Sequence, residues 1–431
     1  MTRTAALPDW TRGQDAREGD RVAFGALLAF TVILTLAPQS FLPALAPLRI
    51  ALLSALVALA SYAIPRLLMN RPLSVNVPEI RLGALLGAWA FVTIPFGLWP
   101  GGSFAVFSGN FLKTLVISWL LCNVVTTVTR LRRVFVLLTL VAVPLAATAF
   151  HQYTSGTFLK GGPADAAARI KGYEAPLTSN PNDLALMLNV ILPITVALAT
   201  SPRPPFPRIV LATIAAASVA GVVLTFSRAG FLTLAAIIVL WMVRLKGRVF
   251  LEVALVAAAA CLALLPLLPS GYTKQLSTIT NTEADATGSA GERMRDMAAA
   301  GKYTMGHPIV GAGLGNSTLA LNEVRGTTWR KVHNVYLELA VELGLPGAIL
   351  FVFLLRAAIK SARQARELSR RPGGDPETAA LSDGIVISLW GFVIASIFHP
   401  VSYHLYFYYL AALAVAAYGI ARRALPEEVH A

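Results

Sequence analysis

The chain has 431 residues, of which 56% are hydrophobic and 13% charged, and its formal net charge is +14. A mean hydropathy of +0.65 is typical of a polytopic membrane protein and excludes a soluble globular domain. Nucleic-acid binding explains the positive charge poorly, because most of the excess Lys and Arg lies beside apolar stretches, where it faces lipid headgroups, and no soluble basic domain remains to hold a groove.

Twelve apolar stretches are each long enough to cross a bilayer, which takes roughly 17 to 25 residues in a helix. The stretch at 229–243 is the shortest, but omitting it would put the basic run at 244–248 on the wrong side of the membrane. We therefore expect an all-α integral membrane protein with about 12 transmembrane helices, at 22–39, 47–65, 82–99, 111–128, 134–152, 183–200, 208–226, 229–243, 249–268, 335–358, 382–399 and 404–421.

Loops rich in Lys and Arg alternate with loops that nearly lack them, and this alternation sets the orientation, since cytoplasmic loops carry the excess. Both termini are expected in the cytoplasm, and the two long loops are expected outside it. The predicted organisation is a cytoplasmic tail, nine helices with one outer loop, a large outer loop, three helices and a second cytoplasmic tail, at 1–21, 22–268 with its loop at 152–182, 269–334, 335–421 and 422–431.

The first outer loop carries Arg169 and Lys171 and ends in the run 180–183, Asn-Pro-Asn-Asp. Asn180 and Asn182 fit a turn followed by an N-cap of the sixth span. The start of that helix would point outward and offer partial positive charge and free backbone N–H groups to an anion.

Arg228 lies in a tight outer turn between the seventh and eighth spans, closely flanked by apolar residues. An arginine at the centre of a bilayer costs on the order of 2.5 to 3.5 kcal/mol on insertion scales, so an arginine at this interface calls for an anionic partner. An arginine that only reaches up to the headgroups is the structural alternative.

The larger outer loop is longer than a connection requires, and loops of this length usually carry function or are disordered. Ser289 and Glu292 have the spacing of a capping box, which predicts the start of a helix. That helix would end near 306–308, with Met294 on one side and Arg293 toward the other. It could lie flat on the membrane surface as a lid.

The same loop ends in a glycine-rich run and a histidine. No strand precedes the glycines at 311–315, so they predict tight backbone turning and not a nucleotide site. His333 and Asn334 follow just before the tenth span, in which Glu338 and Glu342 lie one turn apart. Carboxylates so close to a bilayer must face protein or water, and we expect these two to orient His333 or pair with an arginine.

The last outer turn lies between His399 and His404 and is rich in tyrosine. We interpret it as an interfacial aromatic belt, formed with Tyr403, Tyr406, Tyr408 and Tyr409.

Cationic side chains, one helix start and one histidine can therefore converge outside the cytoplasm. Arginine forks suit phosphate oxygens in two-point contact, and a neutral imidazole can accept a proton near pH 7. This combination is typical of a transferase site for a phosphate-bearing substrate. The two cysteines both fall in predicted spans, and no Cys/His spacing for a metal site is present.

The region 169–347 resembles the O-antigen ligase and O-antigen polymerase superfamily of bacterial inner-membrane glycosyltransferases. The matching pieces are Arg169 with the Asn-Pro-Asn run, the Ser227-Arg228 turn, the glycine-rich stretch 308–315, and His333-Asn334 running into 342–347. The resemblance implies transfer of a glycan from undecaprenyl pyrophosphate to an acceptor sugar hydroxyl, with no metal and no other cofactor. The site would face the periplasm.

The resemblance further implies that Arg169 and Arg228 hold the pyrophosphate and that His333 acts at the acceptor hydroxyl as a general base. Lys171, Arg293 and Arg295 are further candidates for the same anion. Asn180, Asn182, Asn334, Glu338 and Glu342 are expected to orient these groups or support them structurally.

Three alternatives stay open at this point. In a ligase the acceptor is a lipid A core sugar, whereas in a polymerase it is another lipid-linked repeat; both partners are embedded among membrane lipids. A twelve-helix transporter is the alternative from another class, although the link at 201–207 is short where such transporters have a long one. The polar run 316–331 could recognise the acceptor headgroup or be a solvated excursion.

Overall fold

A computed structural model describes residues 18–159, 169–202, 204–244 and 289–424 of the protein. Helices dominate these ranges, and the one extended pairing among them is an isolated bridge between Phe158 and Ile170. The main helices are α1 (Glu18–Leu36), α3 (Ile50–Leu68), α4 (Pro78–Thr93), α5 (Pro100–Val106), α6 (Leu112–Val124), α7 (Val128–Thr154), α8 (Pro181–Thr200), α9 (Pro205–Leu224), α10 (Arg228–Arg244), α13 (Ser289–Gly306), α14 (Ser317–Arg325), α15 (Val335–Ser369), α16 (Pro376–Ala395) and α17 (Leu405–Arg423).

The prediction of an all-α membrane protein is confirmed. Within the described ranges, nine helices are long and apolar enough to cross a membrane. Helices α1 and α10 lie on two further predicted spans, and the predicted span at 249–268 lies outside the described residues. The predicted span at 335–358 is part of a longer helix, because α15 continues to Ser369 through a basic stretch that leaves the apolar region.

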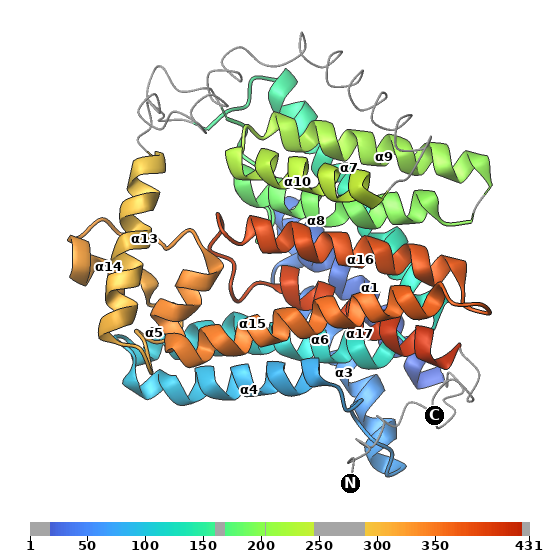
Figure 1. Ribbon diagram of the computed structural model, residues 1–431, viewed down its shortest axis with the longest axis horizontal. Helices are drawn as coiled ribbons and strands as arrows, with labels where there is room; N and C mark the ends of the chain where they lie inside the picture. Colours follow the sequence, from blue (N-terminus) through green and yellow to red (C-terminus); the bar gives the residue numbers. More distant parts are fainter. Residues whose placement is uncertain (1–17, 160–168, 203, 245–288, 425–431) are drawn as a thin grey trace.

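The spanning helices lie side by side, with α13 and α14 at one end of the bundle (Figure 1). Helix α8 packs against α9 and α16, and α15 packs against α16 and α17. Arg66 near the end of α3 pairs with Asp20 near the start of α1, and Arg423 at the end of α17 bonds to the Thr126 carbonyl. The start of α1 and the end of α17 lie at the end of the bundle away from α13 (Figure 1).

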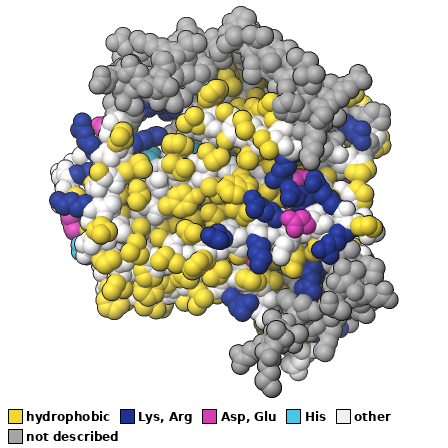
Figure 2. Space-filling view, in the orientation of Figure 1, with side chains coloured by type: hydrophobic (Ala, Val, Ile, Leu, Met, Phe, Trp, Pro, Cys, Tyr) yellow, Lys and Arg dark blue, Asp and Glu magenta, His cyan; other side chains and the backbone are white. Residues whose placement is uncertain are grey.

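A broad apolar surface separates the two ends of the bundle, and Lys and Arg side chains gather at those ends (Figure 2). On α3 alone, Leu53, Leu56 and Ile64 each expose about half of their surface. A soluble protein rarely shows so large a contiguous apolar face, whereas a membrane protein must present one to lipid.

The prediction of an interfacial aromatic belt is wrong. Helix α17 lies inside the bundle, and the exposed fractions of Tyr403, Tyr406, Tyr408 and Tyr409 are between 2% and 7%. The Tyr406 hydroxyl donates to the Leu177 carbonyl, and the Tyr408 hydroxyl donates to the Ser402 carbonyl. These tyrosines are core residues that satisfy buried backbone groups.

Candidate anion-binding site

Asn182 joins the first outer loop to the turn before α10. Its side-chain oxygen accepts from the Arg169 guanidinium at 2.8 Å and from the Ser227 hydroxyl at 2.8 Å. Arg169 also donates through Nε to the Thr225 carbonyl at 3.4 Å. One amide therefore fixes Arg169 beside the Ser227-Arg228 turn, as its predicted supporting role requires.

The start of α8 is capped by its own sequence. Asn180 is the N-cap, Pro181 is the first helical residue, and the Asn180 side chain accepts from the backbone N–H groups of Asn182 and Asp183, each at 3.0 Å. The expectation of free N–H groups for an anion is therefore wrong, because the cap consumes them. Helix α8 contributes a side chain of its first turn, Asn182, instead.

Arg228 is the first residue of α10, and Ser227 caps this helix by accepting from the Gly230 N–H at 3.1 Å. Gly230 allows a close crossing of α8, since a Cβ at this position would lie 2.6 Å from the Cβ of Ala185. The Gly230 carbonyl also accepts from Asn189 of α8 at 2.9 Å. Close packing of the two helix starts therefore positions Arg228, which is half-buried.

Arg293 of α13 is the third cation of this cluster. Burial and the positive charges of Arg293 and Arg228 lower the pKa of Arg169 to about 10. Arg293 and Arg228 can act on Arg169 in this way because both lie near it. Lys171 and Arg295 are exposed, and neither contributes to this effect on Arg169.

His333 is held in a defined tautomer at the edge of the cluster. Its Nδ1 lies 3.0 Å from the Lys331 carbonyl, which can only accept, so Nδ1 carries the proton and Nε2 keeps a free lone pair. Burial and the charge of Arg293 lower its pKa to about 4, with smaller contributions from Arg330 and His399. The imidazole is therefore neutral at pH 7. Asn334 caps α15 by accepting from the Leu337 N–H at 3.0 Å.

His399 belongs to the same cluster and was missed as a site residue. It is 2% exposed, and its two ring nitrogens face the Ala395 carbonyl at 2.9 Å and the Asn182 carbonyl at 3.3 Å. Burial is the main cause that lowers its pKa, and the charge of Arg293 acts in the same direction. Its one sequence signal was its place in an outer turn.

Two ion pairs connect helix α13, which carries Arg293, to the residues at and after the end of α14. Asp296 pairs with Arg325 at the end of α14, and Glu292 pairs with Arg330. Glu292 and Asp296 lie one turn apart and flank Arg293, so both clamps hold the helix turn that carries it. The polar run 316–331 is thus α14 and a clamp on α13. The predicted helix, with its start at 289 and its end near 306, is confirmed.

The glycine-rich run is a backbone turn seated on a kink of α15. Gly344 has φ +67°, and the carbonyls of Val341, Glu342 and Leu343 bond to the Ala312 N–H, the Gly313 N–H and the Trp89 indole, at 2.7, 2.9 and 2.8 Å. The Leu345 N–H donates to the Pro308 carbonyl at 2.8 Å. The turn therefore replaces the helical hydrogen bonds that the kink removes.

Glu338 and Glu342 act on the backbone. The Glu342 carboxylate accepts from the N–H groups of Gly315 at 2.6 Å and Ser317 at 3.0 Å, which caps α14. Glu338 accepts from the hydroxyl and the N–H of Ser402. In the described part of the chain, neither carboxylate is hydrogen-bonded to His333 or to an arginine, so their contacts support loop structure.

The described residues contain no group of three or more His, Cys, Asp or Glu that could hold a metal ion. Residues 213–352 match the protein family described as O-Antigen ligase. The matched region includes Arg228, Arg293 and His333, whereas Arg169 and His399 reach the cluster from outside it. No curated protein matches the chain.

Proposed function

We propose that this chain is a polyprenyl-pyrophosphate-dependent glycosyltransferase of the O-antigen ligase and polymerase superfamily, and the match of residues 213–352 to the O-Antigen ligase family supports this. It would move a glycan from undecaprenyl pyrophosphate to an acceptor sugar hydroxyl, on the lipid A core. The observation that supports this most directly is the cluster of Arg169, Arg228 and Arg293 with the neutral His333.

The arginine cluster suits a diphosphate leaving group. Arg293 and Arg228 both lower the pKa of Arg169, and a diphosphate bound at Arg169 counters that effect, which favours binding of the anion. As the glycosidic C–O bond breaks, its electron pair goes to the diphosphate oxygen, and the fixed guanidinium groups stabilise the charge that develops there. Arginine can do this work without a metal ion.

His333 suits the acceptor side of the reaction. The acceptor oxygen forms the new bond to the anomeric carbon while its proton passes to Nε2, which carries the free lone pair. A pKa of about 4 makes the imidazole a weak base, and after burial the charge of Arg293 is the main cause. Diphosphate bound at Arg293 cancels that charge and raises the basicity of His333, so proton removal is favoured when the donor is in place.

An apolar groove offers space for a lipid chain near the cluster. It has a volume of about 750 Å³ and runs between α1, α3 and α6, with Leu177 and Leu405 in its wall. Leu177 lies in the outer loop that carries Arg169, and Leu405 directly follows His404. Arg49 and Lys113 also line the groove and suit a lipid phosphate.

The orientation belongs to the same proposal. The cluster lies at the end of the bundle away from the described chain termini, and the basic loops gather at the other end. By the positive-inside rule the termini are cytoplasmic and the site is periplasmic, in the inner membrane of a bacterium.

A transfer assay in detergent with purified protein tests the function. We expect Arg228→Gln and His333→Ala to leave a polyprenyl-diphosphate glycan unreacted, whereas Arg295→Gln, an exposed arginine of the same region, retains transfer. Full transfer by both site variants would overturn the assignment. A polymerase is the alternative: deletion of a ligase leaves long lipid-linked chains and bare core, whereas deletion of a polymerase leaves single repeats.

A further inference from the structure

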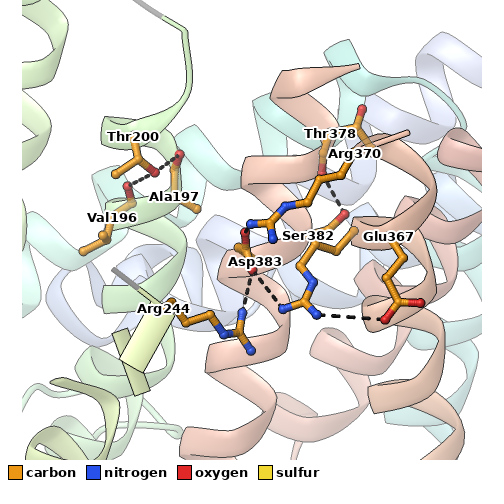
Figure 3. Close-up of polar contacts among 10 residues, drawn as sticks. Val196, Ala197, Thr200, Arg244, Glu367, Arg370, Thr378, Ser382 and Asp383 are labelled. Carbon is orange, nitrogen blue, oxygen red and sulfur yellow. Dashed lines mark hydrogen bonds and ion pairs between the residues drawn. The ribbon is translucent and has the colours of Figure 1, made fainter. Parts of the chain in front are cut away.

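A second cationic cluster lies at the end of the bundle opposite α13 and does not belong to the transfer site. Arg244 is the last residue of α10, and Arg366 and Arg370 lie at the end of α15. All three contact Asp383 of α16, and Figure 3 shows Arg244 and Arg370 beside it. Arg244 and Arg366 donate to Asp383 Oδ1 at 2.5 and 3.5 Å, and Arg370 donates to Oδ2 at 2.5 Å.

Among the residues that the structure describes, the charges of this cluster do not balance. One carboxylate with a side chain only 10% exposed faces three guanidinium groups. The next acid, Glu367, reaches Arg366 at 4.0 Å, but it is 63% exposed, so water screens it. A single ion pair would suffice to neutralise Asp383, so this cluster of described residues has two positive charges in excess of its buried carboxylate.

One hydrogen-bond donor of the cluster is not used by the described residues. The Nε of Arg366 is buried and has no hydrogen-bond partner among the described residues, which is costly for a charged group. Arg370 is 57% exposed, so the cluster can be reached from outside the protein. It lies between three helices, and Lys and Arg gather at this end of the apolar surface (Figure 2).

We propose that Arg244, Arg366 and Arg370 bind the phosphate of an anionic lipid of the inner leaflet, with the acyl chains along the apolar surface of the bundle. A phosphodiester offers oxygens that fit guanidinium forks, and basic pockets between transmembrane helices on the cytoplasmic side bind such headgroups. Asp383 keeps the arginines in place between binding events and lowers their affinity for the anion.

Thermal unfolding in lipid nanodiscs tests the proposal. Cardiolipin in a phosphatidylcholine background should raise the Tm of the unaltered chain, because a ligand that binds only the folded state stabilises it. Arg370→Gln should raise the cardiolipin content that gives half of the Tm increase about tenfold. A hydrogen bond between charged partners contributes a free energy of that order. Arg371→Gln, the exposed neighbour, should leave it unchanged.

Asp383→Asn separates the lipid site from a purely structural ion cluster. If the arginines bind lipid, this variant loses stability in phosphatidylcholine but gains more from cardiolipin than the unaltered chain does. If the cluster is only structural, stability falls equally in both lipids, and the proposal is overturned. A Tm shift produced equally by inorganic phosphate alone would identify a soluble anion and also overturn the lipid assignment.

Discussion

His399 directs one ring nitrogen at the backbone carbonyl of Asn182, 3.3 Å away, so the turn between α16 and α17 touches the residue that also holds Arg169. Segments far apart in the sequence thereby meet at one residue, Asn182. A substitution at His399 should disturb Arg169 through Asn182 without removing any charge from the cluster.

Arg169→Lys should abolish most transfer although it preserves the charge. Lysine cannot reproduce the contacts of the guanidinium with both Asn182 and Thr225, so the cation loses its position. Loss of one fixed donor to a developing anion typically costs about 10² to 10³ in kcat. Steady-state kinetics check this, with Lys171→Arg in the same loop as the matched control. Activity of Arg169→Lys close to that of the unaltered chain would contradict the role.

The free energy of unfolding should depend on pH through the protonation of His333. Its pKa is about 4 in the folded protein against about 6.5 in an unfolded chain. The unfolded state therefore binds more protons between these values, and stability rises with pH across this window and is fully present above about 6.5. His333→Asn should remove this part of the pH profile of Tm, whereas His307→Asn should retain it.

Arg293→Gln should raise the pKa of His333 toward its ordinary value, since Arg293 is the largest charge that lowers it. Titration of the His333 ring by NMR, or the acid limb of kcat/KM, reports this shift. An unchanged midpoint would show that α13 does not lie over the histidine in solution.

The clamp between Asp296 and Arg325 can be tested with a double variant. Asp296 is 1% exposed and Arg325 is 14% exposed, so Asp296→Leu alone leaves a buried charge unpaired and should cost about 3 to 5 kcal/mol of local stability. Asp296→Leu with Arg325→Met should recover most of it. Hydrogen exchange of 289–306 measures the effect, and equal exchange in the single and double variants would contradict it.

Alanine substitution at two glycines tests the close packing at the kink of α15, with Gly344 at the kink and Gly326 as the control. Gly344 has φ +67° and ψ −177°, and Gly326 has φ +86° and ψ +169°, a region that side-chain-bearing residues avoid at a cost of about 1 to 3 kcal/mol. A Cβ at Gly344 would lie 2.2 Å from the Ile309 carbonyl oxygen, whereas a Cβ at Gly326 would meet nothing within 4 Å. Gly344→Ala should therefore lower Tm clearly more than Gly326→Ala does.

Local sequence patterns predicted the helices, because apolar length and capping residues act within one segment. The bounds of α13 and the cap of α8 at Asn180 followed from such signals. The part played by His399 did not, since it depends on how the α16–α17 turn packs against α8. The tyrosines of α17 were wrongly predicted to lie at the membrane interface for the same reason. The composition of a helix does not show whether it lies in the centre of the bundle or faces lipid.

The kink at Gly344 divides α15 into two mechanical pieces. The short outer piece, with Asn334 at its tip, is bonded to the glycine turn, to α14 and to Trp89, whereas the long inner piece belongs to the bundle. The outer piece is also bonded to the turn between α16 and α17, through Val335 and Glu338. A change in the angle at Gly344 would therefore move His333 relative to the membrane-spanning helices, and the contacts on all sides of the outer piece oppose such a change.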